Sequence, residues 1–137
     1  MTINNFNIRV YGILIDNNSV LVADELILGK LVTKFPGGGL SYGEGTIDCL
    51  KREFMEETNN IIEVVDHFYT TDYFQPSAFK KQDQIISIYY LVKSPEAIST
   101  VQVEENLSLR WIAMKDISED DFTLPIDKII GKKLREL

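Results

Sequence analysis

The sequence predicts an α/β fold in which a mixed β-sheet lies between two helices, an α/β/α sandwich. Residues 8–15 and 85–92 are apolar at nearly every position, which is typical of strands buried on both faces. Such strands need cover above and below the sheet. The chain has two segments of helical patterning, at about 47–58 and 126–136. One helix on each face is therefore the economical arrangement.

The first third of the chain predicts a hairpin and a third strand. Residues 8–15, IRVYGILI, are rich in branched side chains that favour strands. The turn cluster DNNS at 16–19 is followed by VLVA at 20–23, the returning strand of the hairpin. A looser strand is expected around 30–35. It leads into PGGG at 36–39, a loop whose glycines allow close approach of the backbone.

Beyond residue 60 the pattern predicts further strands and the closing helix. Residues 61–74 are β-prone and extended, and a loop follows at 75–83. The strand at 85–92, IISIYYLV, comes next. Apolar and polar residues alternate over 107–111, which predicts a half-buried strand. Apolar side chains then recur at helical spacing over 126–136.

Length and composition indicate an ordinary globular protein. The 137 residues suit one domain, residues 1–137, and 45% of them are hydrophobic and 26% charged. The longest apolar runs fall far short of the ~20 residues that a membrane span requires. The N-terminal MTINNFNIRV lacks the features of a signal peptide. A single cysteine, Cys49, cannot form an internal disulfide, so we expect a cytoplasmic protein without a membrane partner.

The net charge indicates which kinds of ligand the protein can bind. The chain has 21 acidic residues and 14 Lys and Arg residues, which give a net charge of −7. This argues against nucleic-acid binding, which depends on basic contacts to phosphate. A small phosphorylated ligand remains compatible with an acidic protein if divalent cations lie between the two.

The helix at 47–58 has recognisable ends and an apolar stripe. Thr46 is the expected N-cap, and Asn59 stands where a left-handed C-terminal cap is expected. The side chains expected to pack on the sheet fall on one stripe: Ile47, Leu50 and Phe54.

Three glutamates, Glu53, Glu56 and Glu57, share the neighbouring stripe of this helix. Like charges at this spacing destabilise a helix, and a lysine would be the usual partner. Because the stripe has none, we expect a cation there, and carboxylates are ligands that Mg²⁺ takes beside substrate phosphates. The alternative is a solvated acidic face, but the glycine loop just upstream favours a site.

The segment PGGGLSYGEGTIDCLKREFMEETNN, residues 36–60, resembles the Nudix hydrolase signature, Gly-x5-Glu-x7-Arg-Glu-U-x-Glu-Glu-x-Gly-U, where U is bulky and aliphatic. The signature departs at its end, where Asn59 replaces the second glycine and Asn60 the final aliphatic residue. The positions that match at the correct spacing are Gly38, Glu44, Arg52, Glu53, Phe54, Glu56 and Glu57.

The resemblance implies the family's α/β/α sandwich and hydrolysis of a nucleoside diphosphate linked to another group, with Mg²⁺ or Mn²⁺. By position it implies that Glu53, Glu56 and Glu57 hold the metal and serve catalysis. The backbone around Gly37 and Gly38 would approach the metal or a phosphate. Glu53 is also a candidate to receive the proton of the attacking water, although family members differ in where that base lies.

The resemblance also implies loop-positioning residues. Arg52 and Glu44 would tie the loop to the helix, since the arginine fork suits a bidentate carboxylate pair. Glu44 can also reach a metal through water. Gly38 and Gly39 would position the loop or the substrate. Cys49 is expected to pack beneath the glycine loop rather than act as a nucleophile.

Outside the signature, Glu105 stands where some relatives carry an additional metal-binding or basic glutamate. Glu104 is its rival, and both suit a solvated loop equally well. His67 is the only histidine, so a zinc site is not expected.

The residues that recognise the substrate are less defined by the sequence. Lys80 and Lys81 lie in a loop that can reach a phosphate, and Pro76 lies where members acting on ADP-ribose often have a proline. Aromatic side chains that either stack on a base or pack in the core are Phe35, Tyr69, Tyr73, Phe74 and Phe79.

We therefore expect a pyrophosphohydrolase acting on ADP-ribose, a nucleotide sugar or a dinucleotide. One alternative is a pyrophosphatase that cleans the nucleoside triphosphate pool, and another is a module that senses a nucleotide without turnover. Apolar edge strands make a homodimer an open possibility.

Overall fold

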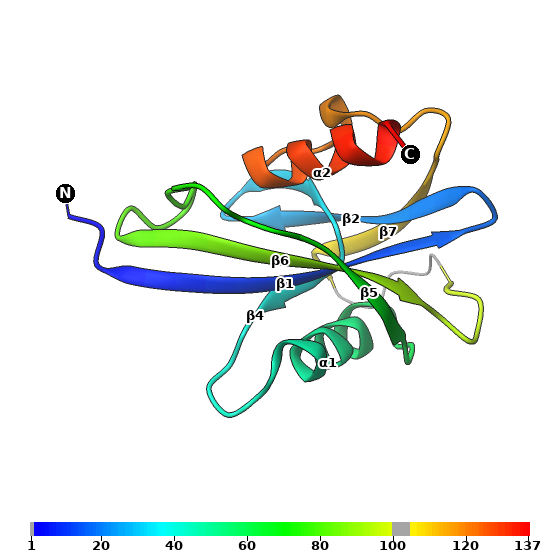
Figure 1. The fold of residues 1–137 in the computed structure, drawn as a ribbon, viewed down its shortest axis with the longest axis horizontal. Helices are drawn as coiled ribbons and strands as arrows, with labels where there is room; N and C mark the ends of the chain where they lie inside the picture. Colours follow the sequence, from blue (N-terminus) through cyan, green and yellow to red (C-terminus); the bar gives the residue numbers. More distant parts are fainter. Residues whose placement is uncertain (1, 100–104) are drawn as a thin grey trace.

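The computed structural model describes residues 2–99 and 105–137, and its two main helices lie on opposite sides of the strands (Figure 1). The predicted α/β/α sandwich is confirmed. No helix in the described part of the chain is both long and apolar enough to cross a membrane. The helices are α1 (Thr46–Thr58), α2 (Pro125–Arg135) and the short 3-10 helix η1 (Glu119–Asp121). The strands are β1 (Asn5–Asp16), β2 (Ser19–Ile27), β3 (Lys30–Lys34), β4 (Gly37–Gly39), β5 (Glu63–Thr70), β6 (Asp83–Lys93) and β7 (Leu107–Ala113).

The sheet is mixed and is organised around β1. Its strand order is β3-β2-β1-β6-β5, with β4 also paired to β1 and β7 to β2. β1 and β6 run parallel from the pair Asn5↔Asp83 to the pair Leu14↔Val92, whereas the other pairings are antiparallel. The two segments predicted as doubly buried strands are therefore central neighbours.

β1 supplies side chains to both layers of the core. Val10 and Leu14 belong to the cluster on the α1 side, and Tyr11 and Ile13 belong to the cluster on the α2 side. This alternation follows from the two-residue repeat of a strand and explains why residues 8–15 are apolar at nearly every position. At Gly12 the absent side chain makes room for the Phe54 ring, which a Cβ would meet at 2.5 Å.

The predicted hairpin and the predicted end of α1 are confirmed in their backbone geometry. Asn17 and Asn18 both have positive φ, 54° and 59°, as a two-residue hairpin turn requires. Asn59 adopts the left-handed conformation, with φ 58° and ψ 29°, and its N–H donates to the Met55 carbonyl. Asparagine thus serves at the position where the signature has glycine.

Two expectations about α1 are wrong. Gly45, not Thr46, is the N-cap, and Thr46 Oγ1 instead lies 2.7 Å from the Tyr90 hydroxyl. Ile47 is 43% exposed, whereas Leu50 and Phe54 are fully buried. The buried face begins only at Cys49, because the first turn of the helix is not covered.

The glycine segment at 36–39 is also more regular than the expected loop. Gly37, Gly38 and Gly39 form the short strand β4 and pair with Tyr11, Val10 and Arg9 of β1. Pairing with a central strand holds this backbone in place, and the missing side chains let two neighbouring groups approach it closely.

Candidate active site

The three glutamates of α1 lie beside the backbone of β4 and differ in burial. Their side chains are 15% exposed at Glu53, 52% at Glu56 and 6% at Glu57. Glu57 Oε2 accepts a hydrogen bond of 2.8 Å from the Gly37 N–H. The Glu53 carboxylate lies so close to Gly38 that a Cβ there would be 2.5 Å from it. The glycines therefore allow carboxylates and main chain to meet.

The expectation that the glutamate stripe has no cationic partner is wrong. Lys34, at the end of β3, is buried, and its Nζ lies 3.2 Å from Glu57 Oε1 and 3.0 Å from Glu25 Oε1. It also donates to the Gly37 carbonyl at 3.3 Å. Burial alone would lower the pKa of Lys34, but Glu57, Tyr11 and Glu25 raise it well above its usual value. The site thus contains a fixed positive charge.

Arg52 ties the segment after β4 to α1, the arrangement that the resemblance implies. Its guanidinium binds Glu44 through two hydrogen bonds, of 3.0 Å from Nε and 2.7 Å from Nη2. Nη2 also donates to the Gly39 carbonyl at 3.1 Å. Nη1 donates to Glu53 at 2.9 Å and to Glu56 at 3.3 Å. The hydrogen bond from Arg52 and that from the Ser41 amide lower the pKa of Glu44 to about 2.

Cys49 lies beneath this loop, where it was expected. Its Sγ is 3.5 Å from the Gly39 carbonyl and the side chain is fully buried. Burial, and then the Glu44 carboxylate, raise the pKa of the thiol to about 11. A thiol of that pKa stays protonated at neutral pH and is a packing group rather than a nucleophile.

The donor chemistry fits a hard divalent cation, since carboxylate oxygens and a main-chain carbonyl are the ligands that such ions take. The carboxylates are nevertheless directed at Arg52 and Lys34. Within residues 2–99 and 105–137 no group of three or more His, Cys, Asp or Glu is positioned to hold a metal. Cation binding would therefore require Glu53 and Glu56 to turn away from Arg52.

Glu105 lies in the turn before β7 and is exposed, and the structure does not group it with the α1 carboxylates into a metal-binding cluster. Its rival Glu104 lies outside the described residues. The role of Glu105 stays a prediction.

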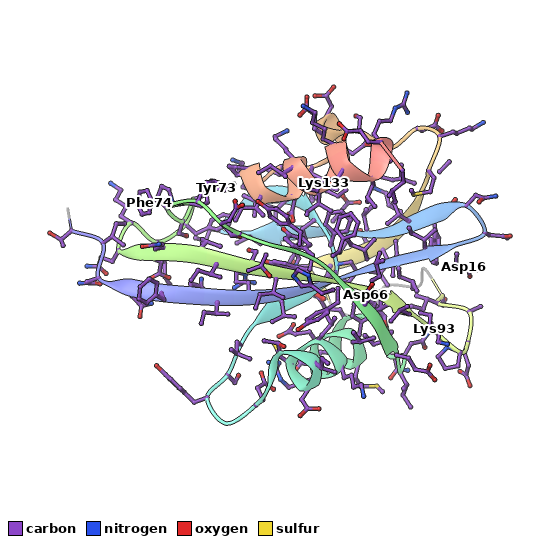
Figure 2. The ribbon with its side chains drawn as sticks, viewed as in Figure 1. Asp16, Asp66, Tyr73, Phe74, Lys93 and Lys133 are labelled. Atoms are coloured by element: carbon purple, nitrogen blue, oxygen red, sulfur yellow. The ribbon has the colours of Figure 1, made fainter. Side chains whose placement is uncertain are left out.

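A cavity of about 600 Å³ lies on the α2 side of the sheet. Its wall is formed by β1, β6, the loop at 75–80 and the residues that begin α2, at 124–127. Figure 2 shows Tyr73 and Phe74, just ahead of that loop, on the same side of the sheet as α2. Lys34 and Arg9 also line the cavity, and because the Lys34 ammonium pairs with Glu57, Lys34 belongs both to the cavity wall and to the cluster of α1 glutamates.

The predicted recognition residues divide between cavity and core. Pro76, Phe79 and Lys80 line the cavity, and Lys81 is exposed without lining it. Phe35 is fully buried and stacks on Phe122. Tyr69 lies beside Tyr89 and beneath the Lys133 ammonium, whereas Tyr73 and Phe74 are partly exposed.

The sequence pattern did not predict the polar groups of the cavity. Asp127 is buried at the start of α2 and accepts a hydrogen bond of 2.5 Å from the Tyr89 hydroxyl. Tyr11 stacks on Tyr89 with 5.3 Å between the ring centroids, and Arg9 Nε donates to the Tyr11 hydroxyl at 2.6 Å. The available signal was Arg9, the one charged residue in the apolar segment 8–15, whereas Asp127 lies among several charged residues of its helix and gave no such signal.

We expect Asp127 to make the free energy of unfolding depend on pH. Burial raises its pKa to about 6, against the Tyr89 hydrogen bond and the charges of Lys34 and Arg9. The folded state holds the Asp127 proton more tightly than the unfolded state does. The contribution of Asp127 to the free energy of unfolding therefore falls as pH rises from about 4 to about 6, and the loss is on the order of 2 to 3 kcal/mol. Denaturant unfolding across this range should show the loss in the wild type but not in Asp127→Asn. Equal slopes of unfolding free energy against pH in the two proteins would contradict the raised pKa of Asp127.

Gly38→Ala is expected to displace the Glu53 carboxylate, because a Cβ would lie 2.5 Å from it. Affinity for Mn²⁺, measured by calorimetry, should fall by about 10–100-fold, the usual effect of disturbing a group that orients a ligand. Gly45→Ala is the matched control, since a Cβ there meets nothing within 4 Å. Equal Mn²⁺ affinity in both variants would show that Glu53 does not depend on the bare backbone at Gly38.

Comparison with known proteins places this site in a family context. A family model described as the NUDIX domain matches residues 6–132. A NUDIX hydrolase from Nitrosomonas europaea has a similar structure, with TM-score 0.76, 16% identity and coverage of 95% of this chain and 88% of that one. A MutT NUDIX hydrolase from Burkholderia pseudomallei has TM-score 0.76 and 16% identity over 98% of this chain and 99% of that one.

An ADP-ribose pyrophosphatase from Streptococcus suis is also similar in structure, with TM-score 0.67 and 13% identity. The match covers 94% of this chain and 87% of that one. At such identities these structures show a shared fold. A sequence search of curated proteins finds no match.

Proposed function

The chain belongs to the Nudix family of hydrolases, and from this premise we propose that it is a metal-dependent pyrophosphohydrolase acting on a nucleoside diphosphate linked to another group. The observation that carries the proposal is that a cavity and the glutamate cluster have residues in common. The cavity on the α2 side shares Lys34 and Arg9 with the cluster formed by Glu53, Glu57 and β4.

The cavity suits the nucleoside part of a substrate. It is lined by the aromatic rings of Tyr11, Tyr89 and Phe79, and Asp127 adds a polar group. Aromatic walls with a few placed polar groups are the usual lining of a small-molecule site. A nucleoside held there directs its phosphates past Lys34 and Arg9 toward the glutamates.

In this proposal Glu53, Glu56 and Glu57 hold Mg²⁺ or Mn²⁺, and the Gly37 backbone approaches the metal or a phosphate. Such cations orient phosphates, lower the pKa of a bound water and neutralise charge on the leaving group. Glu53 is the candidate to accept the proton of the attacking water, since its carboxylate is only 15% exposed and lies against Gly38. Glu105 remains a candidate for an additional carboxylate.

The substrate class that we favour is of the ADP-ribose, nucleotide-sugar or dinucleotide type. Pro76, the residue that pointed to this class, lines the cavity. One structural relative is described as an ADP-ribose pyrophosphatase. Hydrolysis of nucleoside triphosphates is the competing function within the same chemistry.

A substrate panel tests the proposal. The wild type and Glu53→Gln are assayed with Mg²⁺, with Mn²⁺ and with EDTA. The compounds are ADP-ribose, NADH, nucleotide sugars, diadenosine polyphosphates, and ordinary and 8-oxo triphosphates. We expect metal-dependent release of a nucleoside monophosphate from one diphosphate-linked class. Turnover confined to triphosphates would favour the alternative. Absence of turnover, with a nucleotide still raising the melting temperature, would favour a sensing module.

A further inference from the structure

Arg9 occupies the junction between the cavity and the glutamate site. It lies on β1 opposite Gly39 of β4, and a Cβ at Gly39 would be 3.6 Å from its Nη1. Its side chain lines the cavity, and the guanidinium interacts electrostatically with Glu53 and Glu25. A ligand that reaches from the cavity to the α1 carboxylates therefore passes this guanidinium.

The guanidinium is held from one side only. Nε donates to the Tyr11 hydroxyl at 2.6 Å, and the guanidinium carbon lies 5.7 Å from the centre of the Tyr11 ring. Among the described residues, its Nη1 and Nη2 atoms have neither a hydrogen bond nor an ion pair. Arg9 thus presents a positively charged fork whose Nη1 and Nη2 atoms are not engaged by the described residues.

Lys34, the other cation of this junction, is already engaged. Its ammonium contacts Glu57, Glu25 and the Gly37 carbonyl, which accounts for its three donors. Lys34 fixes the carboxylates, whereas Arg9 retains donors for a ligand. A guanidinium with two parallel N–H groups suits the paired oxygens of a phosphate.

We propose that Arg9 binds a phosphate of the substrate's diphosphate and that Tyr11 positions its guanidinium for this contact. This inference rests on the proposed function, because it takes the nucleoside to lie in the cavity. It adds a residue outside the signature that selects nucleotides over nucleosides. The contact needs no divalent cation, since the charge is supplied by the side chain.

Binding without metal tests the inference apart from turnover. Dissociation constants are measured by calorimetry in EDTA for four pairs, ADP and adenosine, GDP and guanosine, CDP and cytidine, and UDP and uridine. In the wild type at least one diphosphate should bind about 10–100-fold more tightly than its nucleoside, the range for hydrogen bonds to a charged group. Arg9→Gln should bring this ratio close to one and leave nucleoside affinity unchanged.

Two further variants make the result specific. Arg9→Lys keeps the charge but not the fork and should retain part of the preference. Arg110→Gln removes an arginine that pairs with Asp24 and does not line the cavity, so it should leave the ratio unchanged. An unchanged ratio in Arg9→Gln, or no diphosphate binding by the wild type in EDTA, overturns the inference.

The outcome is separable from that of the proposed function. If the wild type hydrolyses a substrate and Arg9→Gln keeps the full preference for diphosphates, the proposed function stands and the role of Arg9 is contradicted. If the wild type shows no turnover but its preference for diphosphates is lost in Arg9→Gln, the proposed function fails and the role of Arg9 stands. In an active enzyme, Arg9→Gln should raise KM about tenfold or more while kcat changes less.

Discussion

Replacing Glu53 by glutamine is expected to lower kcat by about 10²–10⁴-fold, the range that a positioned acid–base group contributes. Glutamine has the same shape, still accepts the hydrogen bond from Arg52 and fits beside Gly38. It lacks the negative charge that binds a cation and the basicity that takes a proton. Single-turnover kinetics with the substrate found by the panel, over a range of Mg²⁺ concentrations, measures the loss.

Glu63→Gln is the matched control for this result. Glu63 lies on β5, has a side chain 61% exposed and pairs with Lys93 on the surface. It should retain wild-type kcat. If Glu53→Gln also retained it, Glu53 would be neither a required metal ligand nor the base, and the proposed chemistry would have to use other groups.

Lys34→Met is expected to lower the free energy of unfolding by about 3–5 kcal/mol, the cost of removing one partner of a buried ion pair. Methionine fits the space but leaves the Glu57 carboxylate, 6% exposed, without its cation. Burial already raises the pKa of Glu57 to about 7, against the lowering effect of Lys34 and the Gly37 N–H. Denaturant unfolding at pH 8.5, where Glu57 is ionised in the wild type, gives the largest difference.

A second substitution distinguishes this cause from a packing defect. In Lys34→Met/Glu57→Gln the buried side chain at position 57 is neutral, and its oxygen still accepts the hydrogen bond from the Gly37 N–H. Much of the lost free energy of unfolding should therefore return. Lys93→Met, at a side chain 68% exposed, should change stability by less than about 1 kcal/mol. A double variant less stable than Lys34→Met would contradict the ion-pair account.

The parts of the fold that the sequence predicted depend on local rules. The pair Asn17 and Asn18 marks a turn because asparagine tolerates positive φ, and Asn59 ends α1 for the same reason. The doubly apolar strands follow from burial between two layers. β4 was not predicted as a strand because glycine has no strand preference of its own. Only its pairing with β1 makes the segment extended.

The candidate site was predictable where its residues share one helix. Glu53, Glu56 and Glu57 follow from helical spacing alone. The role of Lys34 was not predictable, because 23 residues separate it from Glu57. Only the packing of β3 and β4 beside α1 brings the two side chains together. Asp127 lies 38 residues from its partner Tyr89, and the same reason applies. Such long-range pairs depend on strand order, which the pattern of apolar residues did not define.

We propose that the α1 carboxylates and β4 together bind a divalent cation. A Mn²⁺ titration followed by NMR tests it most directly, because Mn²⁺ broadens the signals of nearby amides. We expect the amides of Gly37, Gly38 and Gly39 to broaden first, together with those of Glu53–Glu57, and the effect to vanish in Glu53→Gln. Broadening that began elsewhere, such as at the acidic helix η1, and that persisted in Glu53→Gln would contradict the account.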